Sequence, residues 1–155
     1  MMSLLLDSNV FTEYLKGNPD ASALLSKLIN SDFKLFTNET VYNEVLFVYL
    51  RSSIGGYWTL KRRKEDIKRL TKLFISQVLP LLGSTNFLDT THEIALLSLK
   101  FSAEYGLLPS DALILAAAKY YGLDGIVTLD SDLIDVAPRE GLLAISKVED
   151  LEGEP

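Results

Sequence analysis

The sequence contains no cysteine and only one histidine, His92. Without cysteine the chain can form neither a disulfide nor a thiolate zinc site, and a single histidine excludes a histidine-rich transition-metal site. Carboxylate oxygens are therefore the richest metal-binding chemistry that this chain offers. We expect no catalytic role for His92.

Long apolar runs and an excess of positive charge are also missing. The N-terminal apolar run is a few residues long, far below the ~20 that cross a bilayer, and no charged segment of a signal peptide precedes it. The 21 Asp and Glu residues outnumber the 15 Lys and Arg residues, which gives a formal net charge of -6. We expect a cytoplasmic protein without a membrane partner, whose contacts with nucleic acid are local or assisted by a metal ion.

The chain does have enough apolar material for one domain. Hydrophobic residues make up 48% of its 155 residues, which suits a single compact core. We expect one domain over 1–150 and a disordered tail at 151–155. Apolar strand-like runs alternate with amphipathic helical segments, and this order predicts an α/β fold: a three-layer α/β/α sandwich with a central, mostly parallel sheet.

The periodicity and the turn residues place the elements. Strands are expected at 3–6, 33–37, 86–90, 125–133 and 142–146. Helices are expected at 10–20, 21–31, 39–53, 59–79, 92–106 and 109–122, with a loop at 54–58. Asp20, Thr37 or Asn38, and Ser110 are the expected N-caps of the helices that follow them.

Two acids stand directly after expected strands. Asp7 follows the run at 3–6, and Asp130 ends the apolar part of "GIVTLDSDL". Ligands of parallel α/β sheets bind outside the carboxyl ends of the strands, so both side chains are expected at that edge. The alternatives are structural, because Asp7 could cap the next helix, and Asp130 and Asp132 could form a turn.

Two further acids lie on apolar helix faces. Glu44 comes three residues after Val41 and four before Val48, and Asp111 comes four before Leu115. An unpaired buried charge is unfavourable, so a purely structural core avoids one. Glu44 could instead pair with a Lys or Arg, and Asp111 could be an acid favoured by its helix N-terminus.

Carboxylates that meet at one edge would repel one another and raise one another's pKa. A hard divalent cation, Mg²⁺ or Mn²⁺, relieves that repulsion and prefers oxygen ligands. The expected ligands are Asp7, Glu44, Asp111, Asp130 and Asp132.

Four segments, in this order, resemble the PIN-domain ribonucleases and among them the VapC-type toxins of prokaryotic toxin–antitoxin pairs. They are "LLLDSNVF", "TNETVYNEV", "LLPSDALILAAAKYYG" and "IVTLDSDL", and together they extend over nearly the whole chain. The resemblance implies a parallel-sheet α/β/α fold and Mg²⁺- or Mn²⁺-dependent cleavage of RNA by a metal-activated water. It also implies an antitoxin partner and a homodimer, for which the apolar segment "VYNEVLFVYL" offers surface.

The resemblance assigns the acids individually. The three core acids of the family match Asp7, Glu44 and Asp111, and the fourth matches Asp130, with Asp132 close behind as a substitute or supporting group. The family's Asn matches Asn9. Ser8 stands where Thr is usual, and Leu133 replaces the usual Phe. Ser8 and Asn9 are candidate substrate-binding residues.

A dense basic segment, "YWTLKRRKEDIKRL", stands out in an acidic protein. Arg62, Arg63 and Lys64 are candidate contacts to RNA phosphates, and Tyr57 and Trp58 could stack on bases. The alternative is a solvated helix face on which neighbouring acids pair with these cations.

Other functions remain open from the sequence alone. One is an RNA-processing PIN nuclease that has no antitoxin, and another is a PIN-like scaffold that binds without catalysis. A receiver-type phosphotransfer module would also use strand-end acids, and Lys147 would suit it, but "FKLFTN" lacks the required Asp.

Overall fold

The computed structural model describes residues 1–152 and builds them around one parallel sheet. The strands lie in the order β3-β2-β1-β4-β5, and every neighbouring pair is parallel. Their bounds are Ser3–Leu6 for β1, Lys34–Asn38 for β2, Asn86–Leu88 for β3, Gly125–Val127 for β4 and Leu143–Ile145 for β5. The predicted parallel sheet is confirmed.

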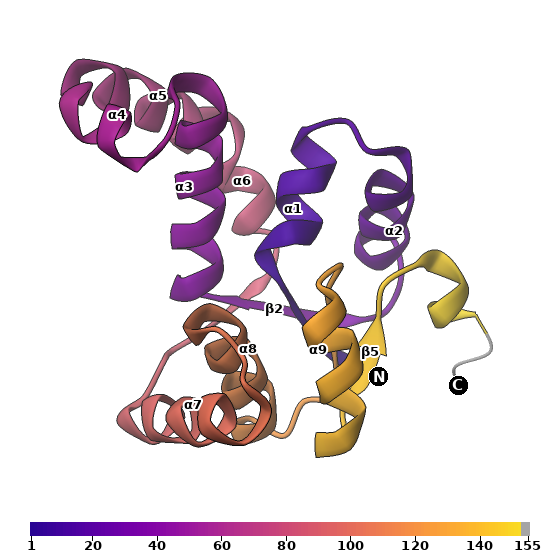
Figure 1. The fold of residues 1–155 in the computed structure, drawn as a ribbon. Coiled ribbons are helices and arrows are strands. Elements are labelled where there is room, and N and C mark those ends of the chain that lie inside the picture. Colours follow the sequence, from indigo (N-terminus) through magenta and orange to yellow (C-terminus); the bar gives the residue numbers. More distant parts are fainter. Residues whose placement is uncertain (153–155) are drawn as a thin grey trace.

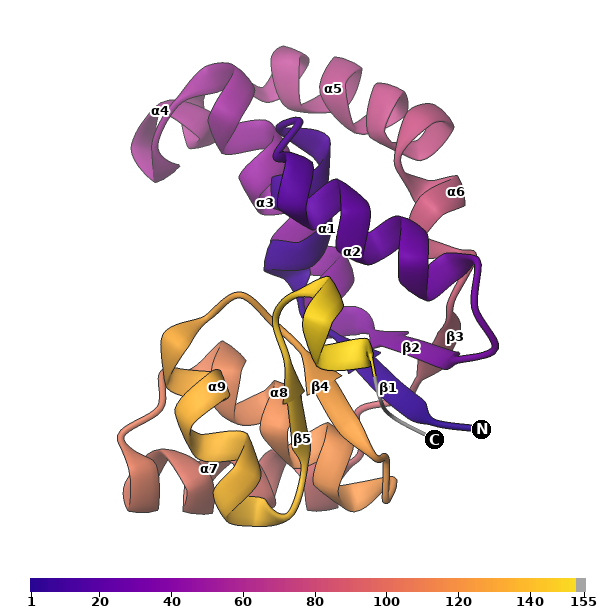
Figure 2. The same cartoon turned by 90° about the vertical axis from the view of Figure 1, so that its right-hand side faces the viewer.

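Helices cover both faces of this sheet (Figures 1 and 2). One face carries α1 (Ser8–Leu15), α2 (Pro19–Ile29) and α3 (Glu39–Ile54). The other face carries α7 (His92–Tyr105) and α8 (Pro109–Tyr120), together with α9 (Ser131–Val136), which follows β4 in the chain and precedes β5. The three-layer α/β/α architecture is therefore as predicted. Because the chain changes face between β3 and β4, the carboxyl ends of β1 and β4 lie at a topological switch point, where open sheets bind ligands.

The segment after α3 forms a small lobe that projects away from the sheet (Figure 1). It contains α4 (Tyr57–Arg62) and α5 (Lys64–Gln77), after which α6 (Leu79–Leu82) returns toward the sheet and buries Leu82 in the main core. The expected single helix over 59–79 is wrong, because the chain leaves helical geometry at Arg63, with φ -109° and ψ 54°. This break lets α4 and α5 pack on α3 and bury Leu50, Leu60 and Leu70 together.

The N-caps of α2, α3 and α8 agree with the expected residues in one helix of the three. Asn38 caps α3 as expected. Asp20 does not cap α2, since its proline neighbour already starts the helix and Asn18 accepts the capping bonds. Ser110 lies inside the first turn of α8, where Leu108 occupies the cap position without a side-chain bond.

The C-terminal boundary differs from the expected one. Leu151 is buried in the short 3-10 helix η2 (Val148–Leu151), so packing continues one residue beyond 150. The end of the expected tail, 153–155, lies outside the described residues. No helix within 1–152 combines the length and the apolar character needed to cross a membrane.

Candidate metal and catalytic site

Asp7 ends β1 and is held by three hydrogen bonds. Its carboxylate accepts from the Ser8 backbone N–H at 2.8 Å, from the Thr128 hydroxyl at 2.8 Å and from the Asn9 amide at 3.2 Å. The residue is also the N-cap of α1, so the structural alternative for Asp7 holds alongside a place in the site. Burial raises the pKa of Asp7 above its usual range, against the lowering effect of these hydrogen bonds.

Ser8 and Asn9, the candidate substrate-binding residues, both bond within the protein. The Ser8 hydroxyl donates to a Glu44 oxygen at 3.3 Å. The Asn9 amide donates to Asp7, and its oxygen accepts from the Leu129 backbone N–H at 3.0 Å. Asn9 therefore joins the start of α1 to the segment that follows β4.

Glu44 lies on the second turn of α3 and is half-buried. One oxygen accepts from Ser8, while the other, Oε1, is buried and has no hydrogen-bond partner among the described residues. Burial and the negative charge of Asp7 raise the pKa of Glu44 from 4.5 to about 7. Pairing with a Lys or Arg, the structural alternative for this acid, does not occur within 1–152.

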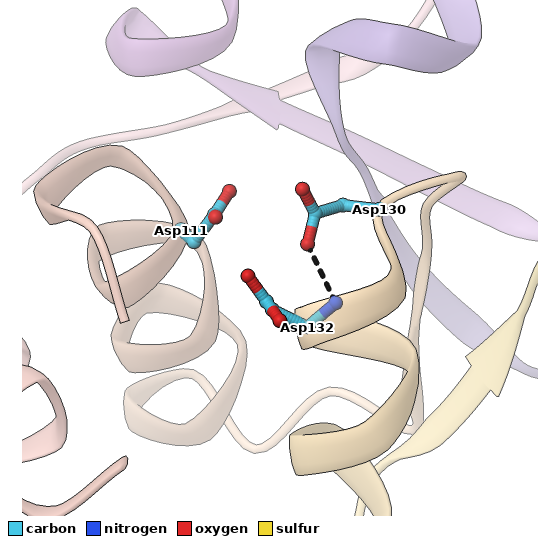
Figure 3. A group of neighbouring side chains, drawn as sticks. All are labelled: Asp111, Asp130 and Asp132. Atoms are coloured by element: carbon cyan, nitrogen blue, oxygen red, sulfur yellow. Dashed lines mark hydrogen bonds between the residues drawn. The ribbon is translucent and has the colours of Figure 1, made fainter. Parts of the chain in front are cut away.

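Three more acids approach one another from α8 and α9 (Figure 3). One carboxylate oxygen from each of Asp111, Asp130 and Asp132 lies within 4.8 Å of the others. Asp130 is the N-cap of α9 and accepts from the Asp132 backbone N–H at 2.9 Å, so these residues start a helix and do not form the turn that was the structural alternative. Burial, followed by the charges of Asp130, Asp7, Glu44 and Asp132, raises the pKa of Asp111 from 3.8 to about 7.

The five acids thus form one electrostatic group, which we call the acid group: Asp7, Glu44, Asp111, Asp130 and Asp132. Its close trio includes Asp132, which the sequence placed last among the expected ligands. No Lys or Arg within 1–152 forms an ion pair with any member. Burial and then repulsion raise the pKa values of Glu44 and Asp111, and the protein itself does not relieve this repulsion.

Thr128 is the supporting residue that the sequence analysis missed. It is fully buried, donates its hydroxyl proton to Asp7, and its oxygen accepts from the Asp130 backbone N–H at 3.1 Å. A threonine directly after β4 and two residues before Asp130 was the available signal.

The basic segment does not lie beside the acid group, because α4 and α5 occupy the projecting lobe (Figure 1). Arg63 pairs with Asp66 at 2.5 Å, and Lys68 pairs with Glu65 at 3.0 Å. Local pairing, the structural alternative, therefore holds for Arg63. Arg62 and Lys64 are exposed and form no ion pair within 1–152.

Comparison with known proteins places this arrangement in a family. The family model described as "PIN domain" matches residues 4–138, which include the whole acid group. The chain belongs to the PIN domain family. This assignment replaces the receiver-type alternative.

Two curated ribonucleases are similar to most of the chain. The chain is 34% identical over 133 residues to Ribonuclease VapC2 of Methanocaldococcus jannaschii, and the match covers 83% of this chain and 85% of the relative. The chain is 32% identical over 146 residues to Ribonuclease VapC6 of the same organism, and this match covers 84% of this chain and 90% of the relative. Among solved structures, a toxin-antitoxin complex from Klebsiella pneumoniae contains a chain with the same fold, at a TM-score of 0.60 and 19% identity, covering 94% and 99%.

Proposed function

We propose that this PIN domain is a divalent-metal-dependent ribonuclease that cleaves RNA phosphodiester bonds. The observation that carries the proposal is the acid group at the carboxyl edge of the sheet, which no cation of the described chain neutralises. The two curated relatives, both named as ribonucleases, support the same activity.

The donor set fits a hard divalent cation. All five side chains offer carboxylate oxygens, the ligands that Mg²⁺ and Mn²⁺ prefer. The buried Glu44 Oε1 has no partner within the described chain. Burial, and after it repulsion between the acids, raises the pKa values of Glu44 and Asp111, and a bound cation would oppose both effects. We assign Asp111, Asp130 and Asp132 as direct ligands, with Asp7 and Glu44 completing the site.

When bound, such an ion lowers the pKa of a coordinated water and offsets the charge that develops on the reacting phosphate. The protein's own contribution is to fix the ligands before substrate arrives. Thr128 and Asn9 hold the Asp7 carboxylate, and Ser8 orients Glu44. Because these donors are themselves part of α1 and the segment after β4, the acids need little reorganisation during the reaction.

Cleavage of a labelled RNA by purified protein tests the proposal. We expect cleavage with Mg²⁺ or Mn²⁺ and none with EDTA. Asp7→Asn should abolish it, and this variant also controls for a contaminating nuclease. Asp32→Asn, which removes an exposed acid before β2 at the opposite edge of the sheet, should cleave like the wild type. Equal cleavage by wild type and Asp7→Asn would refute the proposal.

We also propose that the enzyme is the toxin of a toxin–antitoxin pair, acting in the cytoplasm. The similar fold in a solved toxin-antitoxin complex supports this role. The neighbouring reading frame should encode a small protein that binds the chain and blocks cleavage. An RNA-processing nuclease would cleave RNA but lack such a neighbour, and an inactive scaffold would bind RNA without cleaving it.

A homodimer is the remaining part of the proposal. The apolar segment "VYNEVLFVYL", which was expected to supply the dimer surface, lies on α3. In the structure, the most exposed leucines of a long helix lie on α7, where Leu96 is 54% and Leu99 is 67% exposed. They are three residues apart and share one face of the helix. A second copy of the chain that packs on this face would bury them.

A further inference from the structure

Helix α3 carries a row of side chains that leads from the acid group to the projecting lobe. Phe47 comes three residues after Glu44, and Arg51 comes four residues after Phe47, so the three side chains lie on one face of the helix. Seven residues correspond to about 10 Å along the axis. Phe47 is 40% exposed, and Arg51 is exposed as well. Beyond Glu44, the row is therefore accessible to a ligand.

Two cations in this region lie over aromatic rings. The Arg51 guanidinium carbon is 5.9 Å from the centre of the Phe47 ring, and the Lys61 ammonium is 5.9 Å from the centre of the Trp58 ring. Neither cation forms an ion pair within 1–152. Both are therefore available to an anionic ligand, although the protein as a whole is acidic.

The lobe exposes aromatic area that a structural role does not require. Trp58 is 71% exposed and Tyr57 is 57% exposed, and the two rings meet edge to face with centres 5.2 Å apart. Leu60, on the same short helix, is buried against α3 and α5, so α4 is anchored and its aromatic side faces outward.

A small cavity joins the two parts of this region. Its volume is about 220 Å³, and its lining includes Phe47 from α3 and Tyr57 and Lys61 from α4. Arg51 and Trp58 do not line this cavity, but Arg51 lies over Phe47 and Trp58 lies under Lys61, so both adjoin residues that do. We call these five residues the α3/α4 surface: Phe47, Arg51, Tyr57, Trp58 and Lys61.

Three cations at or after the break between α4 and α5 differ from those of the α3/α4 surface, although Lys64 and Lys72 on α5 form no ion pair within 1–152. Arg63 and Arg69 both pair with Asp66, and Lys68 pairs with Glu65. Their charge is partly compensated locally, and no aromatic ring lies under them among the described cation–aromatic pairs. The combination of free charge and exposed rings is found on the α3/α4 surface instead.

We propose that the α3/α4 surface binds single-stranded RNA on one side of the scissile phosphate. Arg51 and Lys61 contact the phosphates, and the rings of Phe47 and Trp58 stack on unpaired bases. Stacking platforms beside free cations are the chemistry that holds single strands with little sequence preference. Duplex RNA has no free base faces to offer these rings. This inference rests on the proposed ribonuclease activity, and it assigns the contacts with the RNA strand to side chains of α3 and α4.

The single tryptophan of the chain provides a local probe. With EDTA present to prevent cleavage, a single-stranded RNA oligonucleotide should quench the fluorescence of Trp58, and a duplex of the same length should not. Trp58→Ala should weaken binding about fivefold or more, and Trp58→Phe should retain most of it because a stacking ring remains. Loss of affinity in both variants alike would contradict stacking at this position.

Charge removal tests the phosphate contacts. Arg51→Ala with Lys61→Ala should weaken binding and reduce the slope of log affinity against log salt by about 0.7 per lost contact. Arg69→Ala is the matched control, because it removes one exposed but already paired cation from α5. The thermal shift caused by Mg²⁺ should be the same in all of these variants, since the acid group is intact.

The outcomes separate this inference from the proposed function. Quenching of Trp58 by single-stranded RNA without any RNA cleavage would refute the nuclease and leave the α3/α4 surface standing. Cleavage by a wild type whose Trp58 is not quenched, with equal RNA affinity in the Arg51 and Lys61 double variant, would overturn the inference alone. Quenching by the neighbouring antitoxin protein but not by RNA would also overturn it, in favour of a protein-docking surface.

Discussion

Asp7 shows how one side chain supports both the fold and the site. Its carboxylate caps α1 through the Ser8 backbone N–H, and it also accepts from Thr128 on the neighbouring strand segment. Asp130 has the same double role, because it caps α9 while it lies in the close trio. The capping bonds fix the direction of both carboxylates, so the fold itself orients these acids toward the proposed ion.

Asp111→Asn tests the acid group at the level of one residue. We expect loss of cleavage, and a metal-free melting temperature that is unchanged or up to about 4 °C higher, because one repelled charge has gone. The increase in melting temperature on adding Mg²⁺ should shrink relative to the wild type. The control, Asp32→Asn, should keep the full increase. Equal Mg²⁺-induced shifts in Asp111→Asn and wild type would argue against metal ligation by Asp111.

The raised pKa values predict how stability depends on pH. The pKa of Asp111 is about 7 in the folded protein against an ordinary 3.8, and that of Glu44 is about 7 against 4.5. The folded state therefore keeps protons that the unfolded chain releases, and stability without metal should fall as the pH rises from about 4 to 7.

Urea unfolding in EDTA at pH 5 and pH 7.5 measures this effect. The pH dependence should be weaker in the Asp111→Asn, Glu44→Gln double variant, which lacks both titrating groups. With Mg²⁺ present the dependence should also weaken, because the ion favours the ionised carboxylates. A double variant with the wild-type pH dependence would show that other groups cause it.

Among the elements, strand β4 is the one whose backbone is packed most tightly against a neighbouring strand at a glycine. It pairs with β1 and β5, and it leads directly into Thr128 and Asp130. A Cβ atom on Gly125 would lie 2.7 Å from the Leu143 carbonyl oxygen and 2.8 Å from the Leu143 Cβ. Glycine is needed here because the backbone of β5 passes so closely.

Gly125→Ala should therefore force β4 and β5 apart. We expect a loss of about 1–3 kcal/mol in the free energy of unfolding, measured by urea denaturation. Gly56→Ala is the matched control: a Cβ there meets no atom within 4 Å, and the residue has an ordinary φ of -67°. Equal denaturation midpoints for the two variants would contradict the close approach.

The whole molecule combines a net charge of -6 with an acid group that, in the proposed function, acts on a polyanion. The folded chain keeps the acids apart from the cations that could bind RNA phosphates. The acids gather at the carboxyl edge of the sheet, while cations without an ion pair lie over exposed rings on α3 and α4. Helix α3 leads from that edge to the lobe (Figure 1).

Self-association is the prediction at this scale. Light scattering on a sizing column should show a homodimer of the wild type at micromolar concentration. The double variant Leu96→Glu, Leu99→Glu should elute as a folded monomer, because it places charge on the apolar face of α7. Leu15→Glu, an exposed leucine on α1, should remain dimeric. A monomeric wild type would contradict the homodimer, and a dimeric α7 variant would move the interface elsewhere.

The sequence determined the properties that depend on near neighbours. Its alternation of strand-like and helical periodicities gave the parallel α/β sandwich, and the acids after two strands and on two apolar helix faces marked the site edge. Asn38 was recognisable as a cap because capping bonds reach only a few residues. Asp20 and Ser110 were misassigned as caps because a neighbouring proline starts each helix earlier.

Only the tertiary structure decided how distant segments meet. Thr128 became visible as a support for Asp7 because the two residues are 121 positions apart and bond at 2.8 Å. The break at Arg63 follows from burying Leu60 and Leu70 against α3, which local helix propensity does not report. The membership of Asp132 in the close trio depends on the approach of α8 to α9. Each of these contacts joins segments brought together by packing, so a local pattern can mark Thr128 or Asp132 as a candidate but cannot give its partners.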